Sequence, residues 1–185
     1  MGKISKKLFQ KFVDNKNLVL FRDGFISNGC WAIKKSLLNS VLNGSEYKVN
    51  NVITLTALMT QDFILGKIFS DKLLTRVDKE IRYYDNIKFK EHKSNGREYL
   101  LIDNINEFKN YGIDKLYYSI IQKIVGKLAR IRIFRIDYVY YYRKWRWNGE
   151  IDEIAKDTFI FFVWIKSNID DLNNLLAVCR PIKFD

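Results

Sequence analysis

The nearest approach to a catalytic pattern in this sequence is an acidic residue, any residue and a lysine on one predicted strand. Glu91-His92-Lys93 has this spacing, and Asp78 or Asp85 precedes it. In such an arrangement carboxylates hold Mg²⁺, and the lysine positions the water that attacks a phosphodiester. The chain contains four acid-x-lysine triplets, whereas its composition gives about 2.5 by chance. We therefore expect no nuclease activity with Mg²⁺ or Mn²⁺.

Other catalytic and metal-binding patterns are weaker still. His92 is the single histidine and lies among charged residues, which favours a solvated side chain over a catalytic base. Cys30 and Cys179 are far apart and form no CxxC pair, so neither a zinc site nor a disulfide framework is encoded. The nine glycines form no phosphate-binding loop. We expect a protein that binds rather than catalyses, uses no metal or cofactor, and resides in a reducing cytosol.

The charge of the chain favours polyanionic partners. The net charge is +11, from 32 basic and 21 acidic residues, and such an excess attracts nucleic acid through a salt-sensitive term. Part of the lysine content reflects an AT-rich coding sequence, as in many phages and mobile elements. The excess is uneven, however, because residues 148–185 have a net charge of −3 and residues 130–147 a net charge of +5. Five of the six cations in residues 130–147 are arginines, which AT-rich codons do not favour.

A basic and aromatic stretch, residues 132–149, is the candidate binding surface. With the two-residue period of a strand, Phe134 and Ile136 begin one face as core, and the other face is cationic and aromatic. Such a face could stack bases on its rings and bind phosphates with its guanidinium groups. The alternative is an ordinary strand, since tyrosine has high strand propensity and arginine often lies over aromatic rings. The candidate nucleic-acid-binding residues are Arg132, Arg135, Tyr141, Arg143, Lys144, Trp145, Arg146 and Trp147.

The pattern of apolar residues predicts one compact α+β domain over residues 1–185, with mixed or antiparallel sheets and three to four amphipathic helices. Two small subdomains are the alternative. Helices are predicted at residues 3–13, 61–74 and 113–129, with a short one capped by Asn168. Strands are predicted at residues 52–58, and at 130–147 and 158–166 around an acidic connection. Residues 86–92 and 97–103 are predicted to form a hairpin whose turn contains Ser94-Asn95-Gly96. Asp23-Gly24 and Asn28-Gly29 predict the tight turns of a meander at residues 18–35. Pro181 predicts that residues 178–185 form an edge strand.

Two short segments suggest a family. Phe25-Ile26-Ser27-Asn28-Gly29-Cys30-Trp31-Ala32-Ile33 resembles the strand, Thr-Asp-Gly turn and strand of sliding clamp domains, with Ser27 and Asn28 in place of Thr and Asp. Val178-Cys179-Arg180-Pro181-Ile182-Lys183-Phe184 is similar to the strand that closes a bacterial-type clamp subunit. This resemblance implies sheets outside and basic helices inside, around duplex DNA and without sequence readout. A clamp subunit has three such domains, whereas this chain has room for one, or for two very compact ones.

The sequence thus favours a non-enzymatic, basic accessory protein that binds nucleic acid, DNA rather than RNA, without sequence preference. We interpret it as the product of a phage or mobile element, acting in the cytosol of a bacterial host and not at a membrane. The alternative is a protein-interaction module, such as a phage inhibitor of a host defence or replication complex, in which the tyrosine, tryptophan and arginine surface is the interface.

Overall fold

The computed structural model describes residues 4–13, 18–20, 24–42, 49–52, 77–127, 129–146, 149–166 and 175–185. In this part of the chain three α-helices accompany two sheets, as the predicted α+β class requires. The first sheet has eight strands in the order β4-β1-β2-β3-β11-β10-β9-β5, and the second has four in the order β12-β8-β7-β6. All pairings are antiparallel except that of β1 with β4. No helix in these ranges is long and apolar enough to cross a membrane.

The predicted meander is confirmed as three antiparallel strands: β1 (Leu18–Leu20), β2 (Phe25–Ser27) and β3 (Trp31–Lys34). Gly29, in the turn between β2 and β3, has φ 89°, a conformation that favours glycine. The Asn28 side chain closes this turn, because its Oδ1 accepts the backbone N–H groups of Cys30 and Trp31 at 3.0 and 3.1 Å. The turn chemistry in the sequence therefore predicted the local fold correctly.

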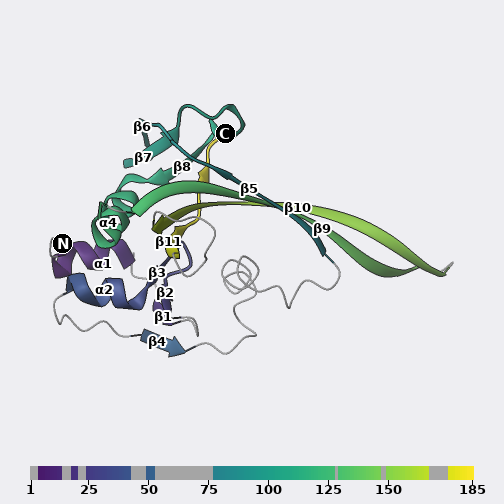
Figure 1. The fold of residues 1–185 in the computed structure, drawn as a ribbon, viewed down its shortest axis with the longest axis horizontal. Helices are drawn as coiled ribbons and strands as arrows, with labels where there is room; N and C mark the ends of the chain where they lie inside the picture. Colours follow the sequence, from purple (N-terminus) through teal and green to yellow (C-terminus); the bar gives the residue numbers. More distant parts are fainter. Residues whose placement is uncertain are drawn as a thin grey trace.

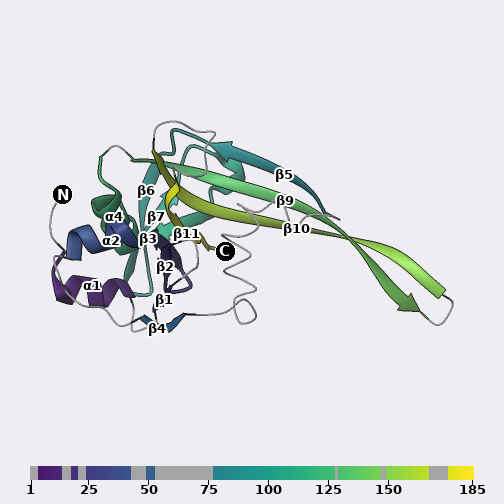
Figure 2. The ribbon, with the colours of Figure 1, turned by 60° about the horizontal axis from the view of Figure 1, so that its bottom comes forward.

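The helices α1 (Lys6–Val13), α2 (Lys35–Leu42) and α4 (Lys115–Val125) lie at one end of the molecule (Figures 1 and 2). Two of them were predicted; α2, which follows β3 without a loop, was not. Helix α4 is shorter than residues 113–129, because the Asp114 carboxylate caps it by accepting the Leu116 N–H at 2.8 Å and the chain turns at Gly126 with φ 82°. Ile113 and Asp114 belong to β8, and Ala129 begins β9.

A stack of aromatic rings joins these helices to the first sheet. The Phe12 and Trp31 rings are parallel within 9° with centroids 4.2 Å apart, and Tyr117 of α4 meets Phe12 edge-on at 5.6 Å. Trp31 Nε1–H also donates to the Phe12 carbonyl at 3.2 Å. Phe12 and Trp31 are almost fully buried, so this stack fixes the position of α1.

The second sheet contains the predicted hairpin, β6 (Phe89–Ser94) and β7 (Arg97–Ile102), with Asn95 and Gly96 at positive φ in its turn. A 3₁₀ turn, η2 (Asn106–Phe108), leads to β8 (Tyr111–Asp114), and β12 (Ile182–Lys183) pairs with β8. The edge-strand prediction holds for β12 only. Val178 and Cys179 belong to β11 (Leu175–Cys179), which is wholly buried between β10 and β3.

Two strands of 18 residues, β9 (Ala129–Arg146) and β10 (Gly149–Lys166), form a long hairpin that projects from the body of the molecule (Figures 1 and 2). The sequence predicted an acidic connection between two strands here. That prediction was wrong, because residues 149–157 are part of β10 and pair in register with β9. Strand β5 (Val77–Tyr84), which was not predicted, lies along the other edge of β9.

Strand β4 (Val49–Val52) overlaps the start of the strand predicted at residues 52–58, and the rest of that strand lies outside the described residues. The helices predicted at residues 61–74 and after Asn168 also lie outside them.

Candidate nucleic-acid interface

Arg132, the first residue of the predicted binding surface, is a buried side chain. It is 3% exposed, and its Nε and Nη2 atoms contact the Asp85 carboxylate at 2.5 and 3.0 Å. Its guanidinium carbon also lies 5.2 Å from the centre of the Tyr83 ring. The exposed position expected from the sequence is thus not observed for this residue. We do not include Arg132 in the interface.

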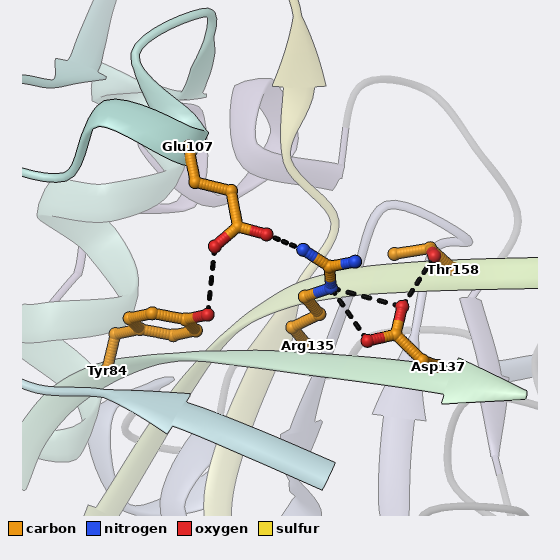
Figure 3. Close-up of polar contacts among 5 residues, drawn as sticks. All are labelled: Tyr84, Glu107, Arg135, Asp137 and Thr158. Carbon is orange, nitrogen blue, oxygen red and sulfur yellow. Dashed lines mark hydrogen bonds and ion pairs between the residues drawn. The ribbon is translucent and has the colours of Figure 1, made fainter. Parts of the chain in front are cut away.

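Arg135 stands at the centre of a polar network that links strands β5, β9 and β10 of the first sheet to η2 (Figure 3). Its Nε–H donates to both oxygens of Asp137 at 3.0 and 2.8 Å, and its Nη1 forms an ion pair with Glu107 of η2. Glu107 also accepts the Tyr84 hydroxyl at 2.9 Å, and Asp137 accepts the Thr158 hydroxyl at 2.6 Å. Two carboxylates therefore offset the charge of Arg135, which makes it a poor phosphate ligand in this arrangement.

The network should make the free energy of unfolding depend on pH in the acidic range, through the carboxyl group of Asp137. Burial raises the pKa of Asp137, but the hydrogen bonds from Thr158 and Arg135 and the charges of Arg135 and Arg82 outweigh burial and hold it below its ordinary value of 3.8. A lowered folded-state pKa contributes stability above the unfolded pKa, and this is lost as pH falls through the folded value. We expect the free energy of unfolding, measured with urea, to fall less steeply between about pH 4 and pH 2 in Asp137→Asn than in wild type. An unchanged slope would contradict this.

The remaining predicted residues belong to the far end of the long hairpin, where the structure describes the backbone alone. Tyr141, Arg143, Lys144, Trp145 and Arg146 are in β9, and Trp147 lies outside the described residues. We call residues 141–146 and 149–154 the distal ribbon, because within the described chain they pair only with each other. The register sets Asp152 opposite Arg143 and Glu150 opposite Trp145.

The distal ribbon is electrically balanced. Its β9 half has three basic residues and its β10 half three acidic ones, so its net charge is zero. Opposite charges on facing strands stabilise a hairpin, and they also reduce the attraction of the ribbon for phosphate. The net charge of +5 in residues 130–147 is therefore not the charge of the surface they help to form.

Acidic residues are absent instead from the three helices α1, α2 and α4, which we call the helix layer. Helices α1, α2 and α4, of 8, 8 and 11 residues, contain six lysines and no aspartate or glutamate. The overall composition predicts about three acidic residues in a segment of this total length. AT-rich codons explain abundant lysine but not missing acids, since the codons of Asp and Glu are not disfavoured. The exposed residues of the helix layer are Lys6, Lys7, Gln10, Lys11, Lys35, Ser36, Asn39, Ser40, Ser119 and Lys123.

Helices α1 and α4 share a groove of about 720 Å³ that also reaches β7. Lys7, Gln10 and Lys11 line it from α1, Arg97 from β7, and Lys115 and Ser119 from α4. Across the described ranges, the five lysines of the helix layer other than Lys115 have no carboxylate partner. Their charges are thus available to an anion in solution.

Glu98 moderates one wall of the groove. Lys115 Nζ lies 2.8 Å from Glu91 and 3.2 Å from Glu98, and Lys93 lies 3.3 Å from Glu98. Hydrogen bonds from Lys115 and Lys93 hold the pKa of Glu98 below its usual value, and those to Glu91 and Glu98 raise the pKa of Lys115. Lys115 is therefore occupied, and Lys7, Lys11 and Arg97 are the cations that the groove offers.

The nuclease-like triplet has ordinary surface partners. Glu91 pairs with Lys115, Lys93 with Glu98, and Asp85 with Arg132. No group of three or more His, Cys, Asp or Glu side chains that could hold a metal ion occurs among the described residues. His92 packs edge-on against Phe184, with ring centroids 5.2 Å apart.

Comparison with known proteins gives no relative: no family model, no curated protein and no solved structure matches this chain. The resemblance to sliding clamps therefore stays a prediction. In the structure, residues 25–33 form β2, a tight turn and β3. Residues 178–184 comprise the end of β11, a short connection and β12. Neither feature is particular to clamps.

Proposed function

We propose that this protein is a non-enzymatic accessory protein that binds nucleic acid, duplex DNA first, without sequence preference through its helix layer. The absence of acidic residues from the helix layer, with five of its six lysines exposed, carries the proposal. Lysines bind phosphates, and serine, asparagine and glutamine donate hydrogen bonds to them; neither contact reads the bases. Neither Cys30 nor Cys179 is in a disulfide bond, which agrees with action in the reducing cytosol of a bacterial host.

Removing two lysines from α1 tests the proposal. Lys7→Gln with Lys11→Gln should reduce the slope of log K against log salt by about 2 for a labelled duplex, since each lost phosphate contact changes it by roughly 1. The measurement is fluorescence anisotropy at several salt concentrations. The matched control is Lys88→Gln with Lys166→Gln, two exposed lysines outside the helix layer, which should leave the slope nearly unchanged. Equal effects of the two pairs would contradict the assignment, and no binding by wild type at low salt would end it.

A shortened hairpin separates the helix layer from the distal ribbon. Tyr141 pairs directly with Ile154, so replacing residues 142–153 with Asn-Gly joins an existing pair by a two-residue turn. The deleted segment has three basic and three acidic residues, so the net charge does not change. We expect the shortened protein to bind duplex DNA as wild type does. A large loss of affinity for duplex DNA would contradict this and would support binding by the basic and aromatic stretch, residues 132–149.

A second candidate function, binding of a partner protein, is favoured by the balanced charge of the distal ribbon. The projecting ribbon contains tyrosine, tryptophan and arginine, the residue types that dominate protein interfaces, and its zero net charge gives phosphate little attraction. On this hypothesis the shortened protein keeps its nucleic-acid affinity and loses a partner that wild type captures from host lysate.

A further inference from the structure

The two faces of the second sheet differ in what covers them. One face packs on the core: Ile102 and Ile113 are buried, and Phe89 meets Tyr118 edge-on at 5.5 Å. The other face contains a hollow of about 650 Å³ between β6, β7, the residues that follow η2 and the segment around β12. Its floor is close-packed, because a Cβ on Gly112 would lie 2.7 Å from Leu101 Cδ2.

Three aromatic rings gather in this hollow. His92 and Tyr99 are directly opposite each other on β6 and β7, and Phe184 stands over both, with centroids 5.2 and 5.0 Å away and ring planes at 80° and 71°. The Phe184 N–H donates to the Asn110 carbonyl at 2.8 Å, which holds this segment against the sheet. His92 and Phe184 are only half-buried, so part of each ring faces the hollow.

Exposed lysines surround the rings. Lys90, Lys109 and Lys183 all line the hollow, and Asp185 is the single acidic residue among the described residues that line it. Lys90 is 3.9 Å from Asp103, whereas Lys109 and Lys183 have no carboxylate partner within the described chain. Rings beside cations on an open sheet suit a ligand that is both planar and anionic.

We propose that this hollow is a second binding site, specific for single-stranded nucleic acid, in which unpaired bases stack on Phe184 and His92 and phosphates bind Lys109 and Lys183. Stacking requires bases that are not paired, and it tolerates any base because each has an aromatic face. The exposed residues of the helix layer include no aromatic ring, so that surface suits a duplex backbone. The site goes beyond the proposed function, since its residues and its ligand are different.

Substitutions at Phe184 test the stacking. With a labelled oligothymidylate of about eight nucleotides, a length within the site size of single-strand binders, Phe184→Leu should weaken binding about 5- to 150-fold, the fold-change that one stacked base corresponds to. Phe184→Tyr keeps the ring and should bind as wild type does. Lys109→Gln with Lys183→Gln should weaken binding and lower its salt dependence. Circular dichroism confirms that each variant is folded, and the Leu and Tyr variants retain apolar packing against Tyr99.

The same variants measured with a duplex distinguish this site from the helix layer. Duplex affinity should be unchanged by Phe184→Leu and reduced by Lys7→Gln with Lys11→Gln, and the reverse should hold for the oligothymidylate. If the affinity for the oligothymidylate does not change in Phe184→Leu, or falls only when the α1 lysines are replaced, the second site is refuted. The proposal for the helix layer is not affected by that result. Single-strand binding that depends on Phe184 without any duplex binding supports the second site and refutes the proposed function.

Discussion

Replacing Trp31 with alanine is expected to lower the free energy of unfolding by about 3 to 5 kcal/mol, the range for removing a large buried aromatic side chain. Trp31 is 2% exposed, stacks on Phe12 at 4.2 Å and donates to the Phe12 carbonyl at 3.2 Å. Its removal leaves a cavity where α1, α4 and β3 meet and an unpaired buried carbonyl. Urea unfolding at neutral pH, followed by circular dichroism, measures the loss.

Trp31→Phe separates the ring from the hydrogen bond. It preserves an aromatic stack but removes the donor, so it should cost only about 1 to 3 kcal/mol, the penalty for an unsatisfied buried acceptor. If Trp31→Ala costs no more than Trp31→Phe, the stack does not hold α1 in place. Since α1 has three of the six lysines of the helix layer, a variant that loosens α1 should also lose part of the salt dependence of duplex binding.

Local patterns allowed correct prediction where local forces decide the fold. The Asn28-Gly29 turn and the Asn95-Gly96 turn were readable, because positive φ restricts which residues can occupy them. The amphipathic periods of α1 and α4 were readable because each buries one face. Helix α2 was missed because it follows β3 directly, without a linker to mark its beginning.

Pairings between distant strands could not be predicted in this way. The acidic residues of β10 look like a solvated loop until the register sets Asp152 opposite Arg143. Val178 and Cys179 look like an edge strand beside Pro181, although β11 inserts between β10 and β3. In both cases the strand partner is distant in the sequence, so the pattern of residues within one segment cannot identify it.

The candidate site follows the same division. Arg132 and Arg135 appeared available for phosphate because Asp85 and Glu107, which pair with them, come from distant parts of the chain. Asp137, the second partner of Arg135, is only two residues away on the same strand. Two of the three helices of the helix layer were predicted, and their segments KKLFQKFV and KLYYSIIQKIV contain no acidic residue, whereas α2 was not predicted. The net charge of one strand leaves out the charges of the strand that pairs with it, whereas the charge of each predicted helix points to the groove that we propose.

The ion pair between Arg132 and Asp85 should respond unequally to the loss of each partner. The Arg132 side chain is 4% exposed and the Asp85 side chain 40% exposed. Asp85→Ala strands a buried guanidinium and is expected to cost about 3 to 5 kcal/mol of the free energy of unfolding. Arg132→Met fills the same space with an apolar chain and leaves a carboxylate that water can still solvate. It should therefore change stability by less than about 1.5 kcal/mol.

The double variant completes the cycle. Asp85→Ala with Arg132→Met should be nearly as stable as Arg132→Met alone, because the cost of Asp85→Ala arises from the charge that it leaves buried. If the two single variants lose the same free energy of unfolding, the prediction is wrong, and water must solvate the Arg132 guanidinium in spite of its low exposure. Arg132→Met should also bind duplex DNA with wild-type affinity, because in the wild type Asp85 and Tyr83 enclose the Arg132 guanidinium. A loss of affinity in a variant that is folded and stable would return Arg132 to the interface and would require β9 to separate from Asp85 when nucleic acid binds.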